Sequence, residues 1–393
     1  MKISFPYMGC VTGYRKMLEL MGHEIIMPPR PTSRTVDLGA KYAPEFLCFP
    51  FKMMLGTYIE VAEQGAELIV STGGRGPCRA GMYGEIHQRI LRQLGYRTEI
   101  AIFDDPTQNR KAFLEQVKGL INHTSLPKAL RSAYLSYRLI ESMDSLEAKL
   151  KTLRPYEAEA GSFDRAWRTI TGWHEGCFSQ KDLKKVRRDS EELLMSIQIR
   201  NVPEAEKLRV GIVGEIYVAM ESAANMDIER KLNSLGIETY NCQSLSHWLH
   251  HHIYPKWSKA NEAIQIMKKA RRYTPLNAGG HNMENIGWMM EYKERGMDGV
   301  VHLMPFGCLP ELITQSLIPD ITRDLDLPIL SMSIDEQTGS VNNQTRLEAF
   351  ADLIAQKKRV KNASVKAPSS QVPAGEGKDT FTAYRQSGSE VRI

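Results

Sequence analysis

The stretch Arg209-Val-Gly-Ile-Val-Gly-Glu215 decides the fold class of this chain. Residues 209–213 have the continuous pattern of a buried strand, and a helical pattern follows at 225–235. Gly236 ends that helical pattern and precedes a second short strand at 237–240. A strand, a helix and a glycine before the next strand are typical of a parallel sheet with crossover helices.

The same alternation fills the first hundred residues, where Phe5-Pro-Tyr-Met-Gly9 opens one α/β part much as Gly211-Ile-Val-Gly-Glu215 opens another. Gly22, Gly65 and Gly95 each stand between a helical stretch and the next strand, where a left-handed helix cap is needed. A structural duplication is one explanation of the two similar openings. The patterns predict strands at 2–5, 24–27, 68–71, 98–103, 209–213, 237–240, 300–303 and 328–331, and helices at 14–21, 49–64, 83–94, 225–235 and 346–356.

The segment 106–207 differs, because helical patterns at 113–121, 129–151 and 182–199 dominate it and strand signals are few. Beyond Lys357 the chain is rich in Ser, Pro, Gly, Gln and charge, a composition that cannot offset the entropy of ordering. We therefore expect an α/β protein with two Rossmann-like parallel-sheet domains, a helical insertion and a disordered C-terminal tail. The expected boundaries are 1–105 for the first domain, 106–207 for the insertion, 208–360 for the second domain and 361–393 for the tail.

Length and charge narrow the class of protein. A chain of 393 residues suits two or three domains. Its formal net charge of +5 is small and the charges are mixed in sign, so nucleic acid and anionic membranes are not expected partners. The N-terminus has no leader pattern and no apolar run approaches a membrane-spanning length, which predicts a soluble, cytoplasmic protein.

Six cysteines are dispersed over the chain, unlike the framework of a small disulfide-rich secreted protein. Cys48, Cys78 and Cys308 each lie just before a predicted helix. In open parallel sheets, strand ends and helix N-termini form the ligand crevice, where the helix dipole favours a thiolate or an anionic cluster. We expect these three thiols to converge, although a small buried apolar side chain is the alternative for any one of them.

The remaining cysteines have weaker settings and are interpreted as structural. Cys177 lies in the expected helical insertion, and Cys242 follows a strand without a neighbouring Gly-Pro pair. Cys10 stands close to a strand end, so an approach to the crevice is a second interpretation for this residue.

These residues belong to a series of motifs that carry a resemblance. The motifs are Phe5-Pro-Tyr-Met-Gly, Ala43-Pro-Glu-Phe-Leu-Cys48, Gly76-Pro-Cys78-Arg, Val213-Gly-Glu-Ile-Tyr-Val, Gly279-Gly-His-Asn-Met-Glu-Asn-Ile-Gly287, Leu303-Met-Pro-Phe-Gly-Cys308-Leu-Pro-Glu and Asp335-Glu-Gln-Thr-Gly with Thr345-Arg-Leu-Glu-Ala-Phe350. In them the chain resembles the acyl-CoA dehydratase activase-related proteins, which are similar to the D-component of 2-hydroxyacyl-CoA dehydratases and benzoyl-CoA reductases. The match runs in order from the N-terminus to about Ala355.

The resemblance implies an oxygen-sensitive [4Fe-4S] cluster held by Cys48, Cys78 and Cys308. Three thiolates leave one iron open to water, a small anion or a substrate carbonyl, whereas an electron-storing cluster is more usually closed by four cysteines. The resemblance also implies single electrons from an ATP-dependent activator protein and action on an acyl-CoA thioester, as a dehydratase-like lyase or reductase component of anaerobic metabolism. Pairing with a similar subunit, as a dimer, is compatible with it.

Two other functions stay open at this point. One is a non-catalytic accessory protein or electron-transfer module that binds a cluster, and the other is a structural zinc protein. Zinc ligands usually come in close pairs such as C-x-x-C, which this sequence lacks. The glycine-rich stretches 73–77 and 211–214 lack the complete phosphate-loop and dinucleotide-binding patterns, so no nucleotide site is predicted.

Three further residues and a run of three histidines carry candidate polar chemistry. His281 and Glu284 stand near a helix start, where they are candidate catalytic groups for proton exchange or a capped helix with a satisfied histidine. Arg79 follows Cys78 and is expected to balance cluster charge, with a surface ion pair as the alternative. The run 250–252 of three histidines is interpreted as a solvated helix face, because consecutive helical residues point in different directions.

Overall fold

The computed structural model describes residues 1–71, 78–103, 110–121, 124–255, 257–258 and 261–366. Over these residues the chain forms two four-stranded sheets with all strands parallel, which confirms the expected α/β fold. The order is β2-β1-β3-β4 in one sheet and β6-β5-β7-β8 in the other, so both sheets share one topology. The strands are β1 (Lys2–Ser4), β2 (Glu24–Ile25), β3 (Leu68–Ser71), β4 (Glu99–Ile102), β5 (Leu208–Gly214), β6 (Ile237–Asn241), β7 (Gly299–Pro305) and β8 (Ile329–Ile334).

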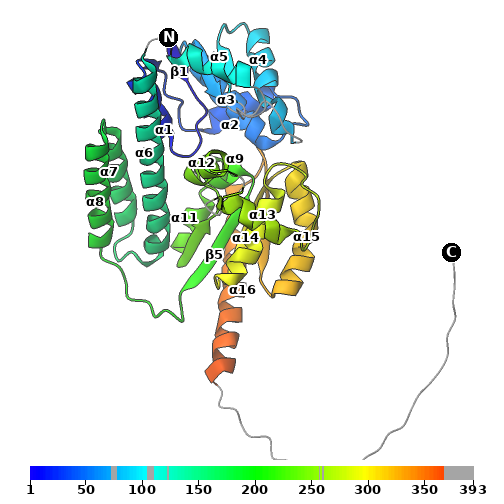
Figure 1. Cartoon of the computed structure of the whole chain (residues 1–393). Helices are drawn as coiled ribbons and strands as arrows, with labels where there is room; N and C mark the ends of the chain where they lie inside the picture. Colours follow the sequence, from blue (N-terminus) through cyan, green and yellow to red (C-terminus); the bar gives the residue numbers. More distant parts are fainter. Residues whose placement is uncertain (72–77, 104–109, 122–123, 256, 259–260, 367–393) are drawn as a thin grey trace, which may run out of the picture.

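Helices cover both sheets and form a separate layer beside them (Figure 1). The first part of the chain contributes α1 (Val11–Leu20), α2 (Ser33–Tyr42), α3 (Phe49–Glu63), the short 3-10 helix η1 (Arg79–Met82) and α4 (Tyr83–Gln93). The middle contributes α5 (Arg110–Ile121), α6 (Leu126–Leu153), the 3-10 turn η2 (Arg154–Tyr156), α7 (Ser162–Glu175) and α8 (Gln180–Ser196). The last part contributes α9 (Ile216–Met220), α10 (Ser222–Asn225), α11 (Ile228–Ser234), α12 (Leu245–Ile253), α13 (Glu262–Ala270), α14 (Asn282–Glu294), α15 (Leu309–Leu325) and α16 (Ser340–Lys366).

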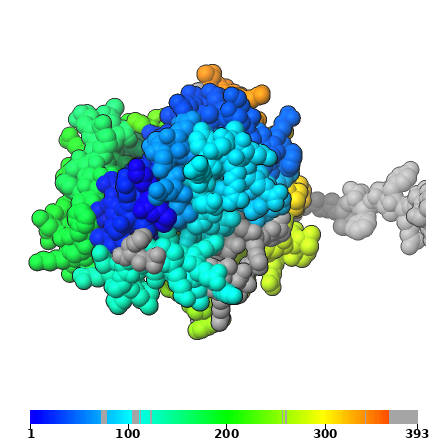
Figure 2. Space-filling view, turned by 90° about the horizontal axis from the view of Figure 1, so that it is seen from above, coloured from blue at the N-terminus to red at the C-terminus, as the bar shows by residue number. Residues whose placement is uncertain are grey.

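The helical middle of the chain packs in two places. Leu120 of α5 shares a core with Ile3, Phe5 and Leu18, so α5 covers the first sheet. The helices α6, α7 and α8 instead form their own layer around a buried Phe163. Figure 2, seen from above, shows this layer on one side of the blue and cyan first part. The terminal helix α16 includes residues 361–366, which were expected in the tail, and 367–393 lie outside the described residues.

One apolar core joins the two sheets. It contains Phe51 and Tyr58 of α3 from the first part and Tyr217 and Val218 of α9 from the second, together with Leu303 of β7. All five side chains are almost fully buried. Burial of large aromatic side chains is worth about 1.5–3 kcal/mol each, so this shared core holds the two sheets together.

The packing of α2 against α3 depends on two glycines. A Cβ atom at Gly39 would lie 1.9 Å from the carbonyl oxygen of Lys52, and one at Gly56 would lie 1.9 Å from that of Thr35. No side chain fits at such a distance, so each glycine lets one helix backbone touch the other. Thr35 then donates a 2.8 Å hydrogen bond to Glu60 across the contact. This contact fixes the loop between the two helices.

We predict that Gly56→Ala lowers the free energy of unfolding by about 3 kcal/mol, because the methyl group forces the two backbones apart. Gly172→Ala is the matched control, since a Cβ at this exposed helical position meets nothing within 4 Å. It should raise stability by about 0.5–1 kcal/mol. Denaturant unfolding measures both, and equal effects of the two variants would contradict the close contact.

An ion pair also ties the first part to the second. Lys52 of α3, with 7% of its side chain exposed, pairs with Glu336 in the turn after β8, with 24% exposed. A nearly buried ammonium group is costly without its partner. Since Lys52 lies one helical turn after Cys48, the pair also fixes the start of α3.

Replacing Glu336 with Gln should lower the free energy of unfolding by about 3 kcal/mol, because Lys52 keeps its charge and loses its carboxylate. The matched control is Glu192→Gln in the exposed pair Arg188–Glu192, whose side chains are 67% and 72% exposed. That variant should change stability by less than about 0.5 kcal/mol. Denaturant titrations of both variants check the difference, and a neutral Glu336→Gln variant would show that the pair does not hold the interface.

Candidate cysteine site

The three candidate ligands share one local structure. Cys48, Cys78 and Cys308 are the N-cap residues of α3, η1 and α15, each with an extended backbone. None of the three side chains caps its helix, so each sulfur is free to face elsewhere. All three are free thiols. Cys78 follows β3 and Cys308 follows β7, as expected, whereas Cys48 lies in the loop between α2 and α3.

Local turns hold these caps in place. Gly307 has a positive φ of 72°, which turns the chain after β7, and the Cys308 amide donates to the Pro305 carbonyl at 3.1 Å. The Cys48 sulfur lies 2.6 Å from the Tyr83 hydroxyl, which joins the start of α3 to the start of α4. The glycine-rich stretch 73–77 before Cys78 lies outside the described residues.

Electrostatic effects link Cys48 to each of the other two cysteines. Cys78 raises the pKa of Cys48, and Cys48 raises the pKa of Cys308. Burial raises the pKa of the Cys48 thiol to about 11 and raises the pKa values of Cys78 and Cys308 as well. Without a cation the three groups are therefore neutral thiols at pH 7, and a metal has to displace their protons.

Arg79 lies beside this group, as the sequence suggested. Its guanidinium donates a hydrogen bond to the carbonyl of Phe46, two residues before Cys48. Its positive charge lowers the pKa of Cys48, against the larger effect of burial. Arg79 is exposed, so its charge reaches the thiol from the rim of the site.

Two glutamates, which the sequence did not single out, accompany the cysteines: Glu311 is buried and Glu215 is partly buried. Glu215 follows β5 and acts electrostatically on all three thiols, and Glu311, in the first turn of α15, acts on Cys78 and Cys308. Burial, with a further contribution from Glu311, raises the pKa of Glu215 to about 7. One feature of the sequence could have identified Glu215: like Cys308, it stands between a strand and the next helix.

The second glutamate belongs to a fixed polar network. Asn285 donates to both oxygens of Glu311 at 3.0 Å and accepts from the Gly214 amide at 3.1 Å. The Nε2 atom of His302 lies 2.8 Å from Glu311 Oε2. Both Glu311 oxygens are thus engaged, and the network connects α14, α15 and the end of β5.

The candidate catalytic pair lies at the start of α14. His281 is the N-cap of α14 and acts electrostatically on Glu284. Glu284 points instead to His247 of α12, whose Nε2 atom lies 2.6 Å from its carboxylate. This pairing lowers the pKa of Glu284 despite the opposing effect of burial. Gly280, the residue before His281, lies against Pro310, two residues after Cys308, because a Cβ atom at Gly280 would be 3.1 Å from the proline ring.

The other cysteines and the histidine run have separate surroundings. The Cys10 thiol donates to Met143 of α6 at 3.4 Å, Cys177 is fully buried near Trp173, and Cys242 is buried beside Tyr292. The histidines are more engaged than a solvated face: His250 contacts Glu141 and Tyr137, His251 contacts Asn261, and the exposed His252 contacts the Trp248 carbonyl.

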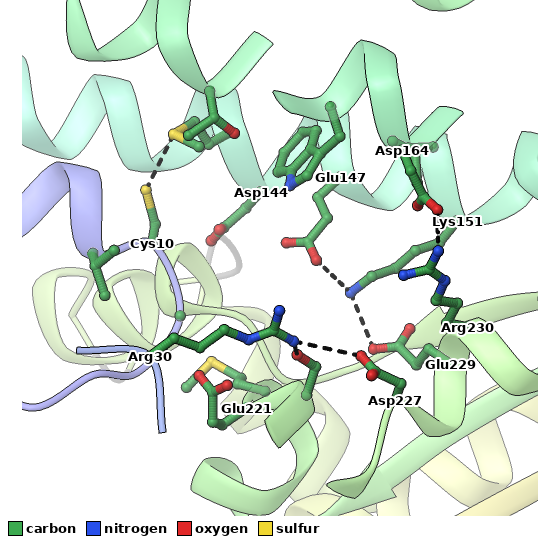
Figure 3. A pocket seen from close by; sticks show the side chains of 18 of the residues that line it. Cys10, Arg30, Asp144, Glu147, Lys151, Asp164, Glu221, Asp227, Glu229 and Arg230 are labelled. Atoms are coloured by element: carbon green, nitrogen blue, oxygen red, sulfur yellow. Dashed lines mark hydrogen bonds and ion pairs between the residues drawn. The ribbon is translucent and has the colours of Figure 1, made fainter. Parts of the chain in front are cut away.

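A polar cavity of 350 Å³ lies where α6, α7 and the segments around β1 and α9–α11 meet (Figure 3). Lys151 bridges Glu147 and Glu229 at 3.1 and 3.0 Å across it. Asp144 and Glu147 point from α6 into the space, and Cys10 lines one end. Because these residues come from the helical layer and from both sheet units, the cavity marks their common junction.

A single-ion metal site and a membrane-spanning helix are both absent from the described part of the chain. Among its residues, no group of three or more His, Cys, Asp or Glu side chains is spaced to hold a single metal ion. None of the helices within that part is both long and apolar enough to cross a membrane.

The fold and the site together define a class: two linked parallel-sheet units with a set of free cysteines at helix N-termini between them. A family model for 2-hydroxyglutaryl-CoA dehydratase, D-component, matches residues 10–354. The chain belongs to this family, and membership supports a role like that of a 2-hydroxyacyl-CoA dehydratase D-component. No curated protein matches the chain.

The polar cavity generates a pH prediction at Asp144. Burial raises the pKa of this carboxyl to about 6, although the Ser246 amide donates to it at 2.7 Å. The folded protein then keeps a proton that the unfolded chain releases from about pH 4 upward, so this contribution to stability is present at low pH and lost as pH rises through 6. The Asp144→Asn variant has no carboxyl group to titrate here and so does not lose this stability. Its free energy of unfolding, relative to that of the wild type, should therefore rise between pH 4 and pH 8 by up to about 3 kcal/mol.

Asp182→Asn is the control of opposite sign. Hydrogen bonds from Ser179 and the Phe178 amide lower the pKa of Asp182, so its stabilisation is present at neutral pH and lost on acidification. That variant should be less stable than the wild type at pH 7, with the difference fading toward low pH. Urea unfolding at several pH values measures both, and a pH-independent effect of Asp144→Asn would refute the assignment.

Proposed function

We propose that this protein is a [4Fe-4S] redox component of the 2-hydroxyacyl-CoA dehydratase D-component type, with the cluster held by Cys48, Cys78 and Cys308. The observation that carries the proposal is that all three cysteines, from three separate segments, are helix N-cap residues, and that Cys48 is linked electrostatically to the other two. Family membership over residues 10–354 supports it, because the family consists in general of cluster-binding dehydratase components.

The residues fit such a group chemically. Soft thiolates select iron–sulfur clusters over hard cations, and an anionic cluster suits the positive ends of three helix dipoles. The uncapped first amides of α3 and α15 are donors for hydrogen bonds to cluster sulfide. The absence of a single-ion site among the described residues is compatible, since cysteine sulfurs around a cubane stand about 6–7 Å apart.

Each residue of the candidate site has a definite task in the proposed function. The cluster supplies one-electron transfer and an iron that can polarise a thioester carbonyl. Cys48, Cys78 and Cys308 hold the cluster, and Arg79 offsets part of its charge from the rim. The shared apolar core beneath the site, with Tyr83 against Cys48, excludes water from the cluster and so protects it from hydrolysis and air.

Partners follow from the same assignment. An ATP-dependent activator protein donates the electrons and an acyl-CoA thioester is the substrate, as the family implies in general. His281 and Glu284 are assigned the transfer of a proton, and pairing with a similar subunit would supply the rest of the substrate site. A non-catalytic electron-transfer role, closer to the activase-related proteins, requires the same cluster but no thioester.

Protein purified without oxygen should be brown, contain about four irons and four sulfides per chain, and lose its colour in air. Cys308→Ala should abolish the colour, because two thiolates from the first part cannot hold the cubane. Cys177→Ala should leave it unchanged, since Cys177 is buried in the helical layer beside Trp173. Iron and sulfide analysis with visible spectroscopy gives the result.

The possible results distinguish an iron–sulfur cluster from zinc, and they also test whether Cys308 is a ligand. A colourless protein with one zinc per chain after anaerobic reconstitution with iron and sulfide would refute the cluster and favour the structural zinc protein. A brown Cys308→Ala variant would keep the cluster and reject this ligand. In a crystal structure of the loaded protein, the three sulfurs should lie about 6–7 Å apart around one centre.

A further inference from the structure

A second cavity, of 450 Å³, adjoins the polar cavity of Figure 3 and lies between α6 and the second sheet. The two cavities share Asp144, Glu147 and Lys151 of α6. The opposite wall is formed by the carboxyl end of the edge strand β6, the following loop 242–244, and the helices α12 and α14. In open parallel sheets, ligands bind at the carboxyl ends of the strands, and this volume suits a small organic molecule.

Two buried residues of this wall carry N–H donors without a partner. The residues Gln243 and Trp288 are only 4% and 5% exposed, and both line the cavity. Among the described residues, neither Nε2 of Gln243 nor Nε1 of Trp288 finds an acceptor. Native interiors contain few such donors, because each gives up its hydrogen bond to water and receives nothing in return. Two of them on the wall of one cavity indicate an acceptor that enters the cavity.

The neighbouring polar groups already have partners. The Tyr292 hydroxyl donates to the Tyr240 carbonyl at 2.7 Å. The Nε2 atom of His247 lies 2.6 Å from Oε1 of Glu284. Of the described residues that line the cavity, none has a buried acceptor atom left unpaired. The cavity therefore offers donors alone, and the group that fits it is a carbonyl or carboxylate oxygen.

The charges on the wall favour the carboxylate. Lys149 of α6 lines the cavity, is half-buried, and makes no ion pair with any described residue. The three acidic side chains of the wall are each engaged: Glu147 pairs with Lys151 at 3.1 Å, Glu262 pairs with Arg295 at 3.2 Å, and Asp144 accepts from the Ser246 amide at 2.7 Å. The charge left over is thus positive, and a hydrogen bond to an ionised acceptor is stronger than one to a neutral carbonyl.

Apolar surface surrounds these donors and predicts the rest of the ligand. The rings of Trp288 and Tyr292 lie 5.3 Å apart between their centroids, and both line the cavity. Met220 and Leu245 add aliphatic surface to the same wall. An inorganic anion would leave this surface without a partner, whereas an acid with an apolar body covers it.

We propose that this cavity binds a small carboxylic acid with an apolar body, whose carboxylate accepts hydrogen bonds from Gln243 and Trp288 and is balanced by Lys149. The inference does not rest on the cluster, because none of the proposed cysteine ligands lines the cavity. The bound acid contacts both α6 and the second sheet, so it stabilises the junction between them. A ligand that binds only the folded chain raises its melting temperature in proportion to occupancy and affinity.

The test measures binding of phenylacetate to the full chain by calorimetry and by the shift in melting temperature. Phenylacetamide and phenethylamine are its neutral and cationic matches, and phenylacetate should bind at least about fivefold more tightly than either. Trp288→Phe and Gln243→Met each remove one donor and keep an apolar side chain, and each should weaken phenylacetate binding about tenfold. Trp173→Phe is the matched control, since Trp173 is partly exposed on α7 and does not line the cavity.

Lys149→Gln should reduce the preference for phenylacetate over phenylacetamide, whereas Lys184→Gln, at an exposed position of α8, should leave it unchanged. Circular dichroism shows whether each variant is folded. The site is overturned if neither phenylacetate nor hexanoate binds saturably at millimolar concentrations, or if both donor variants bind phenylacetate as Trp173→Phe does. Equal binding of phenethylamine would overturn the anionic ligand. A protein that takes up no iron but binds phenylacetate would refute the proposed function and leave this site standing.

Discussion

The packing of α9 against α3 is the contact on which the rest of the site depends. Tyr217 of α9 and Tyr58 of α3 are buried in one core and interact electrostatically, although the two helices belong to different sheets. Cys48 and Cys78 come from the first part of the chain and Cys308 from the second. This contact therefore sets how the segments with Cys48 and Cys78 lie relative to the segment with Cys308.

The same burial that unites the site sets its charge. Neutral thiols and a carboxyl with a pKa near 7 are what a closed apolar setting favours in the absence of metal. If the proposed cluster binds, its negative charge would be compensated by the helix N-termini and by Arg79. A fully exposed set of cysteines would bind iron more readily but would lose it to water and oxygen just as readily.

Much of the fold could be predicted from the sequence, because most of the eight strands contain a short apolar run, as in β3, β5, β7 and β8. The helix α2 was missed, since Thr35, Val36 and Gly39 lower helix propensity. It forms because Gly39 allows contact with α3, a tertiary effect. At the site, the positions of Cys78 and Cys308 follow from strand order. The electrostatic effect of Glu215 on the thiols depends on where the second sheet meets the first, which no local pattern records.

Because the two sheets have the same strand order, the residues that follow equivalent strands can be compared directly. After the third strand of the chain in each sheet, β3 and β7, stands a cysteine, Cys78 or Cys308. After the first, β1 and β5, stand Cys10 and Glu215. Cys10 is turned away by α6, where Met143 covers its sulfur. The helix α6 packs against α1 at this strand end and against β6 of the second sheet, whereas the start of α9 contacts β5 and β7. What surrounds each strand end, rather than the topology, therefore decides which of these equivalent positions faces the thiols.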